Sequence, residues 1–402
     1  MLRLSLPILL LVFALPAAAQ PVPAVGTDAT FDVATWNVVW FGAANGPSDD
    51  ERQLDHVEAV IEGAAVDLWA LQEVADVGYF GRLLDSLGTG YAGLYRDNTS
   101  AGVTQRLAFV YRTDVVRVRS AEQILRDFSQ GSNNAFASRP PLKLDVEVTL
   151  PDTTVTLSVV TVHMKALSDL ESYERRQEAA LRLKNRIDGL HGGEPFILMG
   201  DFNDELGSSI AGGRTTPYDI FLQDPDDYRF LTLAMDEANV PTYCSNGACS
   251  SGSTLDHILI TDELFDAYVD GSAGRFIELT QAISGFVFNT SDHLPVYARF
   301  AFAATGTAVE AGVPPRVPVL GPVYPNPVRD RATLRFVLDR ADVVRLEVYD
   351  LLGRRVAVAA DGYRAAGAHE VTFDVGALPE GVYLVRMQAD GFTAVRRFVR
   401  LR

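Results

Sequence analysis

The hydrophobic and polar positions of the chain change their period several times, and each change predicts an element. Residues 142–150 and 153–163 alternate apolar and polar side chains around Pro151-Asp152, which predicts a long β-hairpin. Apolar runs at 31–39, 67–71, 196–199, 254–260 and 295–302 predict buried strands, and 51–62 and 172–190 have the spacing of amphipathic helices. Together they favour an α/β (α+β) fold of two packed mixed β-sheets flanked by helices.

The start of the chain has the pattern of an export signal. One arginine, Arg3, precedes a short apolar stretch that ends in Ala17-Ala18-Ala19. We therefore expect a signal peptide over residues 1–19. No later run reaches the roughly 18 apolar residues of a membrane span, so we expect no integral membrane segment.

A stretch rich in Gly and Pro divides the remainder into two domains. Residues 303–321 lack an apolar period and predict a linker. We expect one domain over 28–302 and another over 322–402. In the second, short alternating strands with Gly turns predict a small C-terminal all-β sandwich.

Charge is distributed unevenly between the two domains. The 402 residues carry a net charge of −17, but the part before Gly321 has 22 basic and 42 acidic residues, a net of −20. Such a surface argues against binding nucleic acid through a broad basic face, although a small positive cleft stays compatible with it.

Two cysteines lie close together in a loop rich in Gly, Ser and Asn. In an exported protein, Cys244 and Cys249 are expected to form a disulfide. A zinc site is the alternative, but it needs further ligands and only His257 is near. His257 follows Asp256 on a predicted strand and so should point to the opposite face.

Polar residues with useful chemistry stand at the ends of the predicted strands. They are Asn37, Glu73, Arg139, His163, Asp201, Asn203, Asp256, Asp292 and His293. Taken singly, each has an ordinary structural explanation, such as a turn residue, a surface carboxylate or a core histidine. Taken together, they supply what hydrolysis of a phosphoester by water requires. The sequence contains no G-x-S-x-G, P-loop, H-E-x-x-H or EF-hand pattern that would favour another chemistry.

The chemical roles follow from the residue types. Oxygen ligands from Glu73, Asp292 and Asn37 suit Mg²⁺, with Mn²⁺ as an alternative. Asp201 is a suitable base for the attacking water. Asn203, His163, His293 and Arg139 are donors fit for the phosphoryl oxygens.

The motifs that hold these residues resemble those of the endonuclease/exonuclease/phosphatase superfamily. TWN, LQE, SRPP, VH, GDFN, LDHI and SDHLP occur in the order of that family over residues 28–302. The resemblance implies a four-layer sandwich, two sheets covered by helices on both outer faces, and a complete catalytic domain.

The resemblance also implies a role for each residue. At the metal, Glu73 would be the main ligand, Asp292 the second carboxylate, and Asn37 a neighbour of both metal and phosphate. Asp201 would activate the attacking water, and Asn203 and Arg139 would contact the phosphate. His293 would face the scissile phosphate, Asp256 would orient His293, and His163 would be the second active-site histidine. Independently of the resemblance, Tyr173, Arg175 and Arg176 of the following helix are expected to face solvent, with contact to the substrate as the alternative.

The C-terminal domain resembles the sorting domain of type IX secretion cargo. The resemblance is carried by PNP at 325–327, by Tyr349-Asp350 with Gly353-Arg354, and by GVYLVR at 381–386. It implies export and contact with the type IX secretion machinery, followed by release or retention at the cell surface.

These features favour a secreted, divalent-metal-dependent phosphodiesterase that cleaves nucleic acid, with DNA favoured over RNA, acting as a monomer. His163, His293 and SRPP point to the nuclease-like branch, whereas the net charge of −20 speaks against it. The alternative is a phosphatase or lipid-headgroup phosphodiesterase with the same site, acting on an inositol phosphate or a sphingomyelin-like lipid. A non-enzymatic surface protein should have lost Glu73, Asp201 or His293, and all three are present.

Overall fold

The computed structural model describes residues 21–100, 102–131, 133–190, 194–303, 319–338, 341–365, 367–389 and 392–402. The expected signal peptide at 1–19 lies outside the described residues, as does most of the expected linker at 303–321.

The first of two large sheets contains both ends of the front domain. Its strands lie in the order β15 (Gly274–Arg275), β16 (Val296–Phe300), β1 (Phe31–Phe41), β2 (Leu68–Val74), β4 (Arg106–Arg112) and β3 (Tyr91–Arg96). Strands β1 and β2 are parallel, and the other pairs are antiparallel. The sheet is therefore mixed.

The second large sheet has the same plan. Its order is β11 (Tyr228–Phe230), β14 (Asp256–Thr261), β10 (Phe196–Asp201), β9 (Thr153–His163), β8 (Leu142–Leu150) and β5 (Val116–Gln123). Only β9 and β10 are parallel. The hairpin of β8 and β9 has the bounds expected from its alternating pattern.

Each parallel pair is joined by a helix. Helix α1 (Asp50–Ala64) connects β1 to β2, and α3 (Leu170–Leu190) connects β9 to β10. The side chain of Asp49 accepts a hydrogen bond from the backbone N–H of Arg52 and so caps α1. Leu54, Val57 and Ile61 share the buried face of this helix at a spacing of three and four residues.

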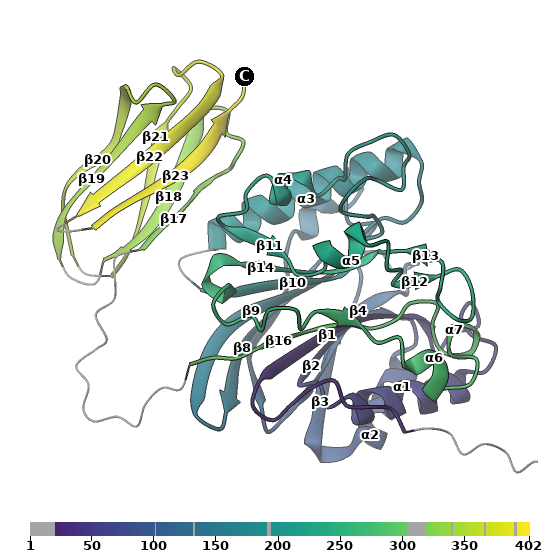
Figure 1. The fold of residues 1–402 in the computed structure, drawn as a ribbon. Coiled ribbons are helices and arrows are strands. Elements are labelled where there is room, and N and C mark those ends of the chain that lie inside the picture. Colours follow the sequence, from purple (N-terminus) through teal and green to yellow (C-terminus); the bar gives the residue numbers. More distant parts are fainter. Residues whose placement is uncertain are drawn as a thin grey trace, which may run out of the picture.

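The two sheets pack face to face, and helices cover their outer faces (Figure 1). Between the sheets, Phe31, Val33 and Phe109 share a hydrophobic cluster with Val159 and Ile197. A second cluster joins the first sheet to α1, α2 (Val77–Leu87), α6 (Leu279–Ala282) and α7 (Phe286–Asn289). A third joins the second sheet to α3 and α4 (Asp219–Leu222). The front domain is a four-layer sandwich, as expected.

Shorter elements connect these layers. They are α5 (Leu233–Glu237), the 3₁₀ turns Gly88–Gly90, Arg126–Phe128 and Asp262–Leu264, and the two-residue strands β6 (Ser129–Gln130), β7 (Asn133–Asn134), β12 (Tyr243–Cys244) and β13 (Gly252–Ser253). Between β12 and β13 runs the loop closed by the Cys244–Cys249 disulfide, which confirms the expected pairing.

The described C-terminal residues form two antiparallel sheets around a separate hydrophobic cluster. One sheet has the order β17 (Val319–Tyr324), β18 (Arg331–Leu338) and β21 (Gly367–Asp374). The other has the order β20 (Arg355–Arg364), β19 (Asp342–Asp350), β22 (Gly381–Ala389) and β23 (Phe392–Arg400). The expected small all-β sandwich is therefore present.

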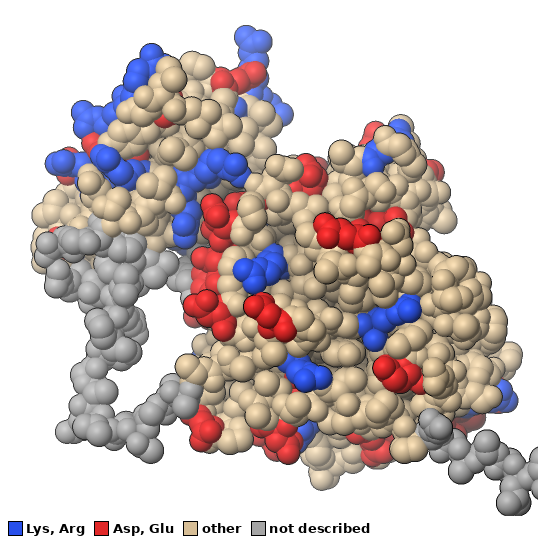
Figure 2. Space-filling view, viewed as in Figure 1, with Lys and Arg blue, Asp and Glu red and all other residues tan. Residues whose placement is uncertain are grey.

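Basic side chains gather over the C-terminal strands, while acidic ones predominate on the visible face of the front domain (Figure 2). This matches the charge difference in the sequence. Within the ranges described above, no helix is both long enough and apolar enough to cross a membrane.

Candidate active site

The strand directions bring the predicted residues to one edge of the sandwich. Asn37 on β1 and Glu73 on β2 lie at the carboxyl ends of a parallel pair, and His163 and Asp201 end the other parallel pair. The antiparallel strand β14 begins at this edge, so that Asp201 is flanked by His163 on one side and Asp256 on the other.

The amide of Asn37 joins the two sheets. Its Nδ2 donates to Oε1 of Glu73 at 3.1 Å and to Oδ2 of Asp201 at 3.0 Å. The second oxygen of Glu73 accepts from the backbone N–H of Trp40 at 3.0 Å. Two carboxylates from different sheets are thus held against one amide.

His163 lies between the same two carboxylates. Its Nε2 is 3.7 Å from Oε1 of Glu73 and 3.5 Å from Oδ2 of Asp201. Burial lowers the pKa of His163 well below its usual range, and the positive charges of Arg139 and His293 lower it further. His163 is therefore neutral at neutral pH, and only one of its two ring nitrogens can donate a proton.

His293 has the opposite electrostatic setting. Its Nδ1 lies 2.8 Å from Oδ2 of Asp256, and that oxygen also accepts from Oγ1 of Thr242 at 2.7 Å. Burial alone would lower the pKa of His293, but Asp256, Asp201 and Asp292 outweigh it and raise the pKa to about 10. At neutral pH His293 is an imidazolium whose Nε2 is a charged donor.

The backbone of His293 is fixed as firmly as its ring. Trp36 Nε1 donates to the carbonyl oxygen of His293 at 2.9 Å, and the N–H of His293 donates to Ser291 Oγ at 3.0 Å. Ser291 Oγ in turn donates to the carbonyl oxygen of Asn37 at 2.6 Å. Strand β1 therefore holds both Asn37 and the segment that contains His293.

Asp201 is the most deeply buried carboxylate beside Asn37. Burial raises the pKa of Asp201 to about 7, against the lowering effect of His293. The backbone N–H of Asn203 donates to Oδ1 of Asp201 at 2.9 Å, and Asn203 Nδ2 reaches the carbonyl oxygen of Met164 at 3.3 Å. A carboxylate with a pKa near neutrality is suited to accept a proton from water.

The backbone at this edge has an unusual conformation. Glu73 and Asn203 have φ of 64° and 52°, in the left-handed region that side chains disfavour. Gly200, before Asp201, approaches β9 so closely that a Cβ there would lie 2.1 Å from the carbonyl oxygen of Val162. The glycine of GDFN is thus required by strand packing. Strained non-glycine residues of this kind concentrate at functional sites.

The donor atoms fit a hard divalent cation. Glu73 is buried and Asp292 is partly buried, and the buried Oδ1 of Asp292 has no hydrogen-bond partner among the described residues. Burial raises the pKa of Asp292, and the charge of Glu73 adds to that effect. A buried carboxylate oxygen without a partner, with a second carboxylate nearby, forms a setting that a cation stabilises.

A second group of potential ligands consists of Asp201, Asp256 and His293, whose ligand atoms lie within 4.8 Å of one another. Nδ1 of His293 already lies 2.8 Å from Oδ2 of Asp256, and that oxygen also accepts a hydrogen bond from Thr242, so both atoms have partners within the protein. The carboxylates of Glu73 and Asp292 are therefore the better ligands.

Arg139 lies behind His163. Its Nε and Nη2 donate to the carbonyl oxygens of His163 and Met164 at 3.2 and 2.8 Å, and its Nη1 donates to Gln105 at 3.0 Å. Burial lowers the pKa of Arg139 to about 10, so the group stays charged at neutral pH. Three of its five N–H donors therefore have partners within the protein.

The expectation for the helix after His163 was wrong at two of three residues. Tyr173 and Arg176 are buried, and only Arg175 is partly exposed. Arg176 forms an ion pair with Asp204 at 2.9 Å, because α3 turns this face toward the GDFND loop. Asp204 of that motif could have indicated the burial of Arg176, because a buried carboxylate requires a nearby cation.

The structure also places Thr242, which the sequence did not indicate, and His257, which was not expected to belong to the site. Thr242, which contacts Asp256, was missed, since no motif marks it. His257 does point away from the site, and its Nδ1 and Nε2 lie within hydrogen-bond distance of Thr232 and of the carbonyl oxygen of Asp204.

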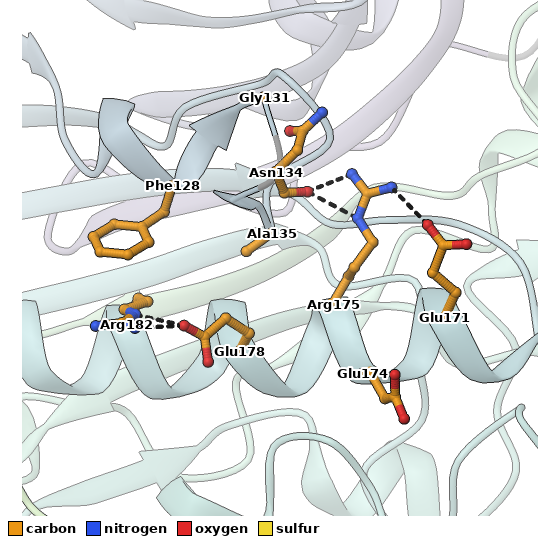
Figure 3. Close-up of a pocket in the computed structure, with 9 residues that line it drawn as sticks. All are labelled: Phe128, Gly131, Asn134, Ala135, Glu171, Glu174, Arg175, Glu178 and Arg182. Carbon is orange, nitrogen blue, oxygen red and sulfur yellow. Dashed lines mark hydrogen bonds and ion pairs between the residues drawn. The ribbon is translucent and has the colours of Figure 1, made fainter.

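A cavity of about 580 Å³ lies between α3 and the segment that contains Phe128 and Asn134. Figure 3 shows Arg175 reaching from α3 to the backbone of Asn134, with Glu178 and Arg182 on the same helix. Glu178 pairs with Arg182 at 2.6 Å, and Glu171 lies 3.9 Å from Arg175. None of the predicted site residues lines this cavity.

A family model provides the decisive comparison. The model of the Endonuclease/Exonuclease/phosphatase family matches residues 34–293, a range that contains every residue of the site. The chain belongs to this family. Its members hydrolyse phosphoesters with divalent metals, so the chain is a phosphoesterase by family. The model of the Secretion system C-terminal sorting domain matches residues 322–400, and the chain accordingly carries a domain for export to the exterior or the outer surface.

The chain is also similar to several solved structures. The human Nocturnin catalytic domain with bound sulfate is 20% identical with a TM-score of 0.49, and 68% of this chain and 95% of that chain are covered. A mannosyl-6-phosphatase of Bacteroides thetaiotaomicron is 17% identical (TM-score 0.48; 68% and 100% covered). D. rerio TDP2 with a single-strand DNA product is 14% identical (TM-score 0.49; 68% and 100% covered). No curated protein matches the chain.

Proposed function

We propose that this protein is a secreted, divalent-metal-dependent phosphodiesterase that cleaves nucleic acid, with DNA preferred over RNA. The observation that carries the proposal is the contact of Asn37 with both Glu73 and Asp201. It places a metal-ligand carboxylate and a proton-accepting carboxylate against one amide. The catalytic domain extends over 28–302, and residues 322–402 direct export through the type IX machinery.

The metal site consists of Glu73, Asp292 and Asn37. Oxygen donors of this kind bind Mg²⁺, and Mn²⁺ is an alternative. When bound, the ion supplies positive charge that stabilises the phosphoryl oxygens during hydrolysis. The buried Oδ1 of Asp292 without a partner supports this assignment.

Asp201 accepts a proton from the attacking water. The water oxygen forms a bond to phosphorus while the bond from phosphorus to the leaving oxygen breaks. The pKa of Asp201, raised to about 7 by burial, makes its carboxylate basic enough for this step. The N–H of Asn203 at 2.9 Å fixes the orientation of that carboxylate, and the Asn203 amide contacts the phosphate.

The two histidines act in different protonation states. His293, an imidazolium held by Asp256 at 2.8 Å, faces the phosphoryl oxygens and stabilises the charge that develops there. His163 is neutral, so one of its ring nitrogens is available to donate a hydrogen bond to the substrate. Arg139 adds a further positive charge to the phosphate side of the site.

The second candidate function is a phosphatase or lipid-headgroup phosphodiesterase that uses the same residues. The net charge of −20 before Gly321 favours it, since a polyanion is repelled by an acidic surface whereas a small phosphoester is affected less. The substrate, rather than the chemistry, separates the two candidates.

One assay tests both. The purified protein is incubated with supercoiled plasmid, RNA, bis(p-nitrophenyl) phosphate and p-nitrophenyl phosphate, each with Mg²⁺ or with EDTA. Plasmid nicking that requires Mg²⁺ is the expected result. Intact plasmid with turnover of the small esters assigns the second function. No turnover of any ester contradicts both.

A further inference from the structure

Two buried arginines hold the segment that connects β9 to α3. Arg139 donates to the carbonyl oxygens of His163 and Met164. Arg176 Nη1 donates to the carbonyl oxygens of Lys165 and Leu167 at 2.7 and 2.8 Å. Because its carbonyls are bound in this way, the segment after His163 has a defined position beside the reaction centre.

Lys165 projects from this segment and differs from the other two lysines of the chain. Lys143 pairs with the carboxylate of Asp145, and Lys184 lies 3.1 Å from Asp188 and 2.8 Å from Asp224. The ammonium of Lys165 donates to the carbonyl oxygen of Ala166 at 3.1 Å. Across the described ranges, no carboxylate forms an ion pair with it. An ammonium has three donors, so two of them remain for a ligand.

Three arginines act on the charge of Lys165, and two of them have carboxylate partners: Arg175 lies 3.9 Å from Glu171 and Arg176 lies 2.9 Å from Asp204. Burial lowers the pKa of Lys165, and the guanidiniums of Arg175, Arg139 and Arg176 lower it further, while Asp169 acts in the opposite direction. A fold that holds like charges together carries an electrostatic penalty, which a bound anion relieves. Among the described residues, Lys165 and Arg139 form no ion pair with a carboxylate, in contrast to Arg175 and Arg176.

The neighbouring cavity beside α3 has no excess of positive charge. Three glutamates and two arginines line it, and both arginines face glutamates (Figure 3). An anion would meet as much repulsion as attraction there. The unpaired positive charge lies on the side of Lys165 and Arg139, next to His163.

We propose that Lys165 and Arg139 form a second anion subsite beside the reaction centre, which binds a phosphoryl group of the substrate other than the one hydrolysed. This inference rests on the proposed function and specifies its substrate class. The class is phosphoesters with a second phosphoryl group, such as a nucleotide chain or a sugar bisphosphate. Lys165 supplies the mobile charge, and Arg139 supplies the two N–H donors that the protein does not use.

The test compares substrates with and without the second phosphate. With Mg²⁺, KM and kcat are measured for dTpdT, for pdTpdT and dTpdTp, for glucose 6-phosphate and glucose 1,6-bisphosphate, and for bis(p-nitrophenyl) phosphate. The proteins are wild type, Lys165→Met, Lys165→Arg and Arg117→Met. Arg117 is an exposed residue of β5 paired with Glu147, so its loss matches the change in net charge.

In wild type, we expect at least one compound that carries a second phosphate to have a KM about tenfold lower than the matched compound without it. A tenfold difference corresponds to one charge-assisted contact. Lys165→Met removes this preference and leaves kcat and KM for bis(p-nitrophenyl) phosphate within twofold of the wild-type values. Lys165→Arg retains most of it, and Arg117→Met is unchanged. Whether the nucleotide or the sugar pair shows the preference identifies the source of the phosphate.

Three outcomes contradict the subsite. A wild type that hydrolyses the esters without any preference overturns it, as does an equal loss on every ester in Lys165→Met. If wild type hydrolyses bis(p-nitrophenyl) phosphate alone, the same compounds are measured as its competitive inhibitors, and inhibition independent of Lys165 overturns the subsite. Failure on every ester with Mg²⁺ instead contradicts the proposed function itself.

Discussion

The side chain of Asn37, near the end of β1, donates a hydrogen bond of 3.0 Å to Asp201, which ends β10 in the opposite sheet. The two residues are 164 positions apart in the chain. Their contact exists only because the two sheets pack so that the carboxyl ends of both parallel pairs reach the same edge. The proposed metal site and the proposed base are therefore parts of one hydrogen-bonded unit.

Asp201→Asn tests the proposed base. The substitution keeps the shape and most hydrogen bonds but removes the proton acceptor, so kcat should fall by about 10²–10⁴ with the melting temperature nearly unchanged. Hydrolysis of bis(p-nitrophenyl) phosphate measures kcat, and calorimetry measures the melting temperature. The exposed Asp226→Asn is the matched control and should retain full activity. Near wild-type turnover in Asp201→Asn would rule out the role.

Glu73→Gln tests the metal site. Loss of one anionic ligand should shift the Mg²⁺ titration of activity to concentrations at least tenfold higher. Asp292→Asn should shift the titration in the same direction. The exposed Glu62→Gln on α1 controls for the general loss of negative charge. If the Mg²⁺ titration of Glu73→Gln overlays that of wild type, Glu73 is not a ligand.

Asp256→Asn tests the protonation state of His293. Burial lowers the pKa of His293, and Asp256 is the strongest of the influences that raise it to about 10. Without that carboxylate the pKa of His293 falls. As the pH is raised, the imidazolium therefore loses its proton at a lower pH than in wild type. The alkaline limb of the kcat profile should move toward neutrality. It should stay in place in the exposed Asp266→Asn.

The NMR resonances of the His293 ring provide a direct measurement of the same effect. Their titration midpoint should fall in Asp256→Asn together with the alkaline limb of kcat. An alkaline limb that does not move, despite a changed ring titration, would show that His293 does not act as the charged donor.

Removal of the disulfide tests its structural role beside the site. The backbone N–H of Cys244 donates to the carbonyl oxygen of Asp292 at 2.7 Å, so the closed loop borders a proposed metal ligand. The loop is short, and we expect Cys244→Ser/Cys249→Ser to lower the free energy of unfolding by about 2 kcal/mol. Denaturant unfolding measures this difference, with the exposed-loop variant Ser250→Ala as the control. Two free thiols in the mass spectrum of the exported wild type would refute the bond.

The sequence predicted the elements whose pattern is local. The hairpin of β8 and β9 has its expected bounds because a period of two and a two-residue turn leave little freedom in register. The ends of β1 and β10 extend two residues beyond the expected strands, because Phe41 pairs with Val74 of β2 and Asp201 pairs with His163 and Asp256 of the strands beside it. The disulfide was predictable since the cysteines are only five positions apart.

The sequence by itself thus determined the candidate residues, their order and the two-part organisation, because residue type and local period are written in the chain. Only the tertiary structure decided how those residues meet. The Asn37 contact, the Thr242 contact with Asp256, and the burial of Arg176 against Asp204 each join segments that lie far apart in sequence. Their positions depend on sheet packing and helix rotation, which sum many weak interactions that no local pattern records.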